Sequence, residues 1–132
     1  MEPTTDDRLQ QAITAHQEGR LEEAEHLYQK ILEAQPTNLD ANKNLSVLLY
    51  KLGRLDEAVV SLKKTIELKP DFIEAYYDLA NTLYKLDRFN EAEKHFKKVI
   101  ELKPGHIEAY YNLGVIFRDL DRFDEAEKNF KK

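Results

Sequence analysis

The sequence has no cysteine and no tryptophan, and it has only four glycines and four prolines in 132 residues. Without cysteine there can be no disulfide scaffold, no thiolate zinc site and no cysteine nucleophile, and the chain suits a reducing cytoplasm. No apolar run approaches the ~20 residues that a membrane-spanning helix needs. We therefore expect a soluble, cytoplasmic protein that does not insert into membranes.

A large excess of charge of one sign is also missing. The chain has 20 basic and 25 acidic side chains, which give a net charge of −5 and a pI near 5.4. A mildly acidic surface is a poor general ligand for nucleic acid or anionic lipid, so we expect no nucleic-acid partner. Hydrophobic residues make up 42% of the chain, which is enough for the core of a single domain over residues 1–132.

The prolines reveal an internal repeat. Pro36, Pro70 and Pro104 follow one another at intervals of 34 residues, and a fixed period of this length is typical of stacked helical or sheet repeats. The repeats span roughly 5–38, 39–72, 73–106 and 107–132, the last of them truncated. Apolar residues recur at spacings of three and four in each repeat, which predicts two helices per repeat. The eight predicted helices lie near 5–18, 22–35, 38–51, 56–69, 72–85, 90–103, 106–119 and 124–132.

The turn between the two helices of a repeat has its own pattern. Gly19 and Gly53 occupy this turn in the first two repeats, where glycine tolerates a positive φ, and Asp87 and Asp121 replace them in the last two. Asn90 is predicted to cap the second helix of the third repeat. The same position holds Glu22, Asp56 and Asp124 in the other repeats.

The period and the residue pattern resemble the tetratricopeptide repeat, whose signature is W-x2-L-G-x2-Y, then A-x3-F, then P. The fourth repeat reads Tyr110-x2-Leu113-Gly114-x2-Phe117, then Ala126-x3-Phe130. The other repeats follow the same positions, and the small residues are placed where the two helices cross. The resemblance implies an all-α, right-handed α-solenoid of antiparallel helix pairs, with the first helices lining a concave groove. It also implies a non-catalytic scaffold that binds a peptide or an extended protein segment in that groove.

By this resemblance the groove is lined by the second, fifth, sixth, ninth, twelfth and thirteenth positions of each repeat. The sixth position reads Gln10, Asn44, Asp78 and Asn112. A carboxamide both donates and accepts hydrogen bonds, so a row of them can pair with a peptide backbone, whereas Asp78 can only accept. The row resembles the asparagine ladder in the repeat domain of O-linked N-acetylglucosamine transferases. The alternative is that these residues belong to the family's common N-L-G sequence, whatever it binds.

Twelve residues form the predicted peptide-binding site. Those expected to pair with a peptide backbone are Asn44, Asp78, Asn81 and Asn112; the aromatic anchors are Tyr50, Tyr77, Tyr84 and Tyr111; and the residues expected to set charge preference are Lys43, Lys51, Lys85 and Arg118. The tyrosine rings could instead cover neighbouring repeats. The second position is always acidic, at Asp6, Asp40, Glu74 and Glu108. These acids either complement the helix dipole or form a rim that selects basic peptides.

No motif of an enzyme is present. The sequence has no Gly-rich phosphate loop, no H-E-x-x-H and no G-x-S-x-G. The pairs Glu22/His26 and Glu91/His95 have the spacing of exposed helix pairs, which we favour over a metal site. We therefore predict no catalytic residue, no metal and no cofactor.

The chain stops at Lys132, inside the last predicted helix, so we expect a fragment of a longer protein. Four side chains of the last repeat are predicted to leave apolar area uncovered: Leu113, Phe117, Ala126 and Phe130. Large exposed apolar patches mark interfaces, which predicts a homo-oligomer formed through this end. Two further functions stay open, a substrate-recognition module of a larger transferase such as a glycosyltransferase, and a self-assembling structural solenoid.

Overall fold

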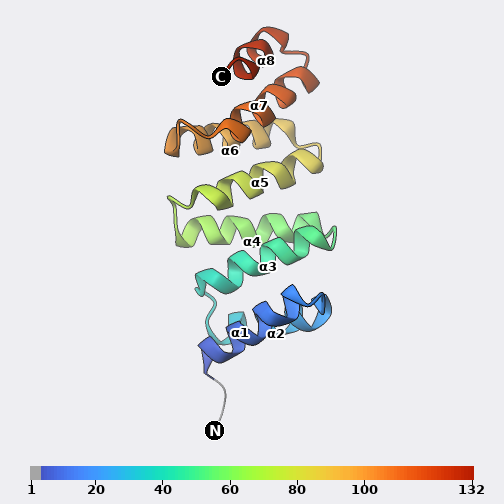
Figure 1. Cartoon of the computed structure of the whole chain (residues 1–132), viewed down its shortest axis with the longest axis vertical. Helices are drawn as coiled ribbons and strands as arrows, with labels where there is room; N and C mark the ends of the chain where they lie inside the picture. The colour runs from blue at the N-terminus through green and yellow to red at the C-terminus, as the bar shows by residue number, and fades with distance from the viewer. Residues whose placement is uncertain (1–3) are drawn as a thin grey trace. The chain divides into compact units, whose positions relative to one another are not determined.

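The structure, a computed structural model, describes residues 4–132. Its helices are α1 (Thr5–Gln17), α2 (Leu21–Ala34), α3 (Leu39–Lys51), α4 (Leu55–Leu68), α5 (Ile73–Lys85), α6 (Phe89–Leu102), α7 (Ile107–Asp119) and α8 (Phe123–Phe130) (Figure 1). No strand occurs within residues 4–132. Every predicted helix is present, with ends within about two residues of the prediction. The all-α fold of successive helix pairs, the class of the α-solenoids, is therefore confirmed.

The chain divides into two compact units, Met1–Lys69 (unit 1) and Pro70–Lys132 (unit 2). In unit 1 each helix from α1 to α4 packs against the next, and in unit 2 the same holds from α5 to α8. Short turns join successive helices, which therefore run antiparallel within each pair (Figure 1). Each unit thus consists of two stacked helix pairs, one pair for each sequence repeat.

Small residues let the two helices of a pair approach closely. Ala12 and Ala24 are fully buried between α1 and α2, and Ala80 and Ala92 are fully buried between α5 and α6. A Cβ atom added at Gly114 in α7 would lie 2.7 Å from an aromatic carbon of the α8 residue at position 130. The predicted role of the small positions in helix crossing is therefore confirmed.

The turn inside each repeat requires a left-handed residue. Gly19 and Gly53 have φ values of +80° and +74°, and Asp87 and Asp121 take the same conformation at +60° and +61°. The N–H of the following arginine then donates back to the preceding helix, as from Arg54 to the carbonyl of residue 49 at 2.9 Å. The sequence prediction for this turn is confirmed, including the two aspartates that replace glycine.

The predicted caps of the second helices are wrong. Asn90 and its equivalents at positions 22, 56 and 124 lie second in their helices, inside the first turn. The N-cap residue is an arginine in every repeat, at Arg20, Arg54, Arg88 and Arg122, and none of these makes a side-chain cap hydrogen bond. In each repeat the left-handed residue is followed directly by the arginine, and the second helix begins at the next residue, so the arginine occupies the N-cap position. Each arginine instead bonds a glutamate three residues further on.

Candidate functional site

The predicted groove residues lie on the first helices of the repeats, α1 and α3 in unit 1 and α5 and α7 in unit 2. Side chains at positions i, i+3 and i+4 of a helix share a face, so the fifth, sixth and ninth positions of a repeat lie together. We call this surface of each unit its groove face. Asn44, Asp78, Asn81 and Asn112 on this face are all half-buried. Part of each of these side chains is therefore accessible.

A carboxamide cluster forms the centre of the groove face of unit 2. The Asn112 side-chain amide on α7 donates to the hydroxyl of Tyr77 at 3.1 Å and to the amide oxygen of Asn81 at 3.2 Å, both on α5. Asn81 and Asn112 also line a pocket of about 180 Å³, together with Tyr84, Phe96 and Val115. Both donors of Asn112 are thus used within the protein, while its oxygen and the amide donors of Asn81 remain available to a ligand.

The tyrosines of unit 2 differ in how free their rings are. Tyr77 packs edge-on against Phe96 at 5.9 Å between ring centroids and lies 4.9 Å from the ring of His106. Tyr84 donates its hydroxyl to Asp119 at 2.7 Å, and this hydrogen bond to a carboxylate raises the pKa of the Tyr84 phenol. Tyr111 is 59% exposed. Of these three rings, Tyr111 is therefore the one most open to a partner.

The groove face of unit 1 contains a pair of basic groups. The Lys51 ammonium on α3 donates to Nε2 of His16 on α1 at 3.2 Å, and Nδ1 of His16 lies 3.5 Å from the hydroxyl of Tyr28. Burial and, to a smaller degree, the charge of Lys51 lower the pKa of His16, so the imidazole is neutral at pH 7. Lys43 and Tyr50 on α3 are half-buried on the same unit.

Two residues that make the contacts described above, His16 and Asp119, were not among the twelve residues of the predicted site. His16 and Asp119 occupy groove positions by register, but neither has a residue type that marks a peptide site on its own. The contact partners of both lie 35 residues away, Lys51 for His16 and Tyr84 for Asp119. A search for pairs of complementary polar residues 35 positions apart, which is one repeat plus one residue, could have found both contacts. The remaining predicted charges, Lys85 on α5 and Arg118 on α7, are exposed.

The apolar patch predicted at the last repeat is largely buried. Leu113, Phe117 and Ala126 have exposed fractions of 3%, 2% and 4%, so the prediction that they leave apolar area uncovered is wrong. Cations cover the Phe117 ring, since the Arg122 guanidinium lies 4.4 Å from its centroid. Phe130 is 44% exposed, as predicted, although part of its ring packs on Gly114.

Within residues 4–132 no helix is both long and apolar enough to cross a bilayer. Over the same range no group of three or more His, Cys, Asp or Glu side chains could hold a metal ion.

Stacked antiparallel helix pairs with a 34-residue period define an α-helical repeat protein. Two sequence models of the tetratricopeptide repeat match residues 15–79 and 71–132, and together they cover most of the chain. The chain belongs to the tetratricopeptide repeat family, as its signature residues predict. Its fold and family place it among protein-interaction scaffolds.

Solved structures of MamA share this fold. One crystal structure of MamA is 27% identical, with a TM-score of 0.87 over 91% of this chain and 70% of that chain. Another is 26% identical, with a TM-score of 0.92 over 96% and 69%. MamA residues 41 to the end from Desulfovibrio magneticus RS-1 are 20% identical, with a TM-score of 0.90 over 97% and 72%, which shows the fold alone. No curated protein matches the sequence.

Proposed function

We propose that the groove face of unit 2 binds an extended peptide segment of a protein partner. The observation that carries this proposal is the hydrogen bond between Asn112 and Asn81. This bond uses neither the amide donors of Asn81 nor the oxygen of Asn112. A peptide unit presents one C=O and one N–H, so it can accept from Asn81 and donate to Asn112. Together the two residues offer a peptide unit the donor and the acceptor that a single asparagine would offer in the predicted ladder.

Side-chain contacts would supply affinity around this backbone pairing. The pocket of about 180 Å³ beside Asn81 and Asn112 has Phe96 and Val115 in its wall, so it suits one apolar side chain of the peptide. Tyr111 on α7 is exposed and has few rotatable bonds, and a ring of this kind buries area at a small entropic penalty. Val115 and Tyr111 lie on α7 with Asn112, and Phe96 reaches the pocket from α6.

Unit 1 would add a groove face of different chemistry. Asn44 is the carboxamide at the sixth position of the second repeat, and Lys51 and His16 bring two basic groups to within 3.2 Å of one another. An incoming carboxylate would allow both groups to be charged, because it offsets their mutual repulsion. Lys43, Lys51, Lys85 and Arg118 would then favour acidic groups wherever the peptide passes them.

The test exchanges the free donors of Asn81 for an acceptor without breaking the internal bond. In Asn81→Asp the new carboxylate still accepts from Asn112, but it no longer donates to a peptide carbonyl. Peptides selected from a random phage-displayed library on the immobilised wild-type chain serve as probes. We expect their affinity to fall about tenfold or more, because a peptide carbonyl then faces a carboxylate. Fluorescence anisotropy of the labelled peptides measures the change.

Asn90→Asp is the matched control, since it makes the same chemical change at an exposed position in the first turn of α6. It should leave peptide affinity unchanged. Failure to select any peptide, or equal affinities for Asn81→Asp and wild type, would contradict the proposal.

A further inference from the structure

One ion pair joins successive repeats in both units. Arg54, before α4, donates to Glu25 on α2 at 2.6 Å. Arg122, before α8, donates to both oxygens of Glu93 on α6, at 2.6 and 3.3 Å. In each case the arginine follows the glutamate by 29 residues, and the glutamate side chain is only 15% or 12% exposed. The same partly enclosed bond therefore ties the second helix of one repeat to the next repeat, once in each unit.

The first and last repeats carry the two halves of this bond separately. Arg20 has the register of Arg54 and Arg122, and Glu127 has the register of Glu25 and Glu93. Arg20 pairs with Glu18 at 2.9 Å and with Glu23, and Glu127 pairs with Lys131 at 2.9 Å. All of these groups are exposed, unlike the acceptors inside the units. Arg20 in unit 1 and Glu127 in unit 2 are thus accessible to another molecule.

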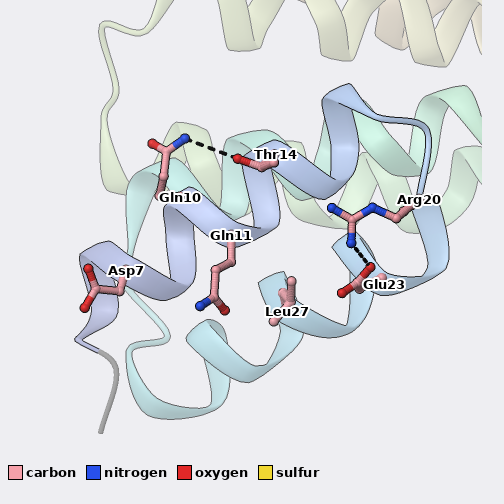
Figure 2. Close-up of a pocket in the computed structure, with 7 residues that line it drawn as sticks. All are labelled: Asp7, Gln10, Gln11, Thr14, Arg20, Glu23 and Leu27. Carbon is pink, nitrogen blue, oxygen red and sulfur yellow. Dashed lines mark hydrogen bonds and ion pairs between the residues drawn. The ribbon is translucent and has the colours of Figure 1, made fainter. Parts of the chain in front are cut away.

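A hollow beside Arg20 lies at the surface which, in the second and fourth repeats, contacts the second helix of the preceding repeat. It has a volume of about 490 Å³ and lies between α1 and α2, where Gln11 and Leu27 are turned toward one another (Figure 2). Asp7, Gln10, Thr14, Arg20 and Glu23 complete its lining.

Two positions of this lining are buried in the second and fourth repeats. Gln11 and Thr14 correspond to Leu45 and Leu48 of the second repeat, which are buried where α3 packs against α2. They also correspond to Leu113 and Ile116 of the fourth repeat. The hollow therefore corresponds to a surface that contacts the second helix of a preceding repeat, but it has Gln11 and Thr14 where the other two repeats have leucine or isoleucine.

We propose that α8 of a second copy of this chain occupies this hollow, so that Glu127 of one copy accepts from Arg20 of the next. Besides the bond between Arg20 and Glu127, Asp7 and Glu23 in the lining of the hollow offer partners to Lys128 and Lys131, which lie on or next to α8. The contact differs from the apolar one predicted from the sequence, since it is polar and salt-sensitive. Because the two faces are different, the contact is heterologous, and each copy can bind one copy through its hollow and another through its α8.

Sedimentation equilibrium of the 132-residue chain, from about 10 μM to about 1 mM, tests the proposal. We expect the average mass to rise above 15.5 kDa and to exceed that of two copies, because each copy presents both a donor face and an acceptor face. A constant mass of 15.5 kDa overturns the proposal. A mass that stops at two copies overturns it as well, because it would indicate a two-fold symmetric contact.

Two variants identify the faces. Arg20→Ala removes the donor and Glu127→Ala removes the acceptor, so each alone should associate about tenfold more weakly. An equimolar mixture contains one intact donor face and one intact acceptor face, so a dimer of the two variants should form at about tenfold lower concentration than any larger species. Both side chains are exposed, so circular dichroism should show unchanged helix content. Growth like that of the wild type in either variant, or no dimer in the mixture, overturns the proposal.

A third variant should strengthen the contact. Glu18 competes for Arg20, and its position holds Leu52 and Leu120 in the repeats whose arginine reaches the preceding repeat. Glu18→Gln weakens this competition, so we expect association to tighten about threefold. Glu22→Gln makes the same change of net charge on α2 and should have less effect. Equal tightening in both variants overturns the assignment to Arg20.

Discussion

Asp87 has a strained backbone conformation, and the glycine at the same position in the first two repeats indicates how to relieve it. It adopts a φ of +60° in a turn where the first two repeats place glycine. A side chain in this left-handed region is disfavoured, although less for aspartate than for most residues. We expect Asp87→Gly to raise the free energy of unfolding by about 0.5–1 kcal/mol. Because the chain has no tryptophan, urea unfolding followed by circular dichroism is the suitable measurement.

The reverse change provides the control for this prediction. Gly53 has a φ of +74°, and a Cβ added there meets no atom within 4 Å, so Gly53→Ala tests backbone strain alone. It should lower the free energy of unfolding by about 1 kcal/mol. The same sign of change in both variants would show that the left-handed conformation is not what distinguishes these turns.

Sequence register placed the site residues on the correct helices but did not predict their contacts. Asn81 and Asn112 belong to different groove positions, the ninth and the sixth, so no ladder of equal positions pairs them. Their hydrogen bond depends on how far α7 is shifted along α5, and that shift is set by packing in the core of unit 2. The pairing of Lys51 with His16 could not be predicted for the same reason.

The ion pair between α6 and the start of α8 should make unit 2 sensitive to acid. Burial alone would raise the pKa of the Glu93 carboxyl, but hydrogen bonds from Arg122 and Lys97 outweigh burial and hold the pKa below its ordinary value of 4.5. The bond therefore contributes stability above about pH 4.5 and loses it as the pH falls through the lowered pKa of the folded state.

Glu93→Gln measures this contribution, because glutamine does not titrate. We expect the difference in unfolding free energy between wild type and Glu93→Gln to be constant near neutral pH and to shrink below about pH 4.5. Urea titrations at a series of pH values give the difference. Glu101→Gln on the same helix is the control, since it makes the same chemical change at a carboxylate that is 69% exposed. A difference that grows in acid would contradict the assigned sign.

Helix positions were predictable from sequence because apolar spacing and the 34-residue period point to the same boundaries. The start of each second helix was not, because Asn90 looks like a cap in sequence while the cap is Arg88. The arginine at this position has a task that the local sequence does not show, since Arg54 and Arg122 bond a glutamate of the preceding repeat. In the third repeat the boundary instead follows the left-handed Asp87, which directly precedes Arg88.

The charge of the whole molecule should govern how fast peptides reach the groove faces. The chain carries a net charge of −5, and exposed acids stand in the first turns of the groove helices, at Asp6, Asp40, Glu74 and Glu108. Lys51 and Lys85 act mainly near contact, because at low salt the field far from the protein follows its net negative charge. At longer range the acids dominate, so a basic peptide should be steered toward the protein even where lysines line the final site.

Versions of one selected peptide with lysine or glutamate flanks test this steering. We expect the lysine-flanked version to associate about tenfold faster at low salt, with dissociation rates nearly equal, and the advantage to vanish at high salt. Stopped-flow anisotropy measures both rates. Glu74→Gln/Glu108→Gln should reduce the advantage more than Glu33→Gln/Glu67→Gln, which changes net charge equally but on second helices. Equal reductions would mean that net charge acts alone, and faster association of the glutamate-flanked version would mean that the groove lysines govern encounter.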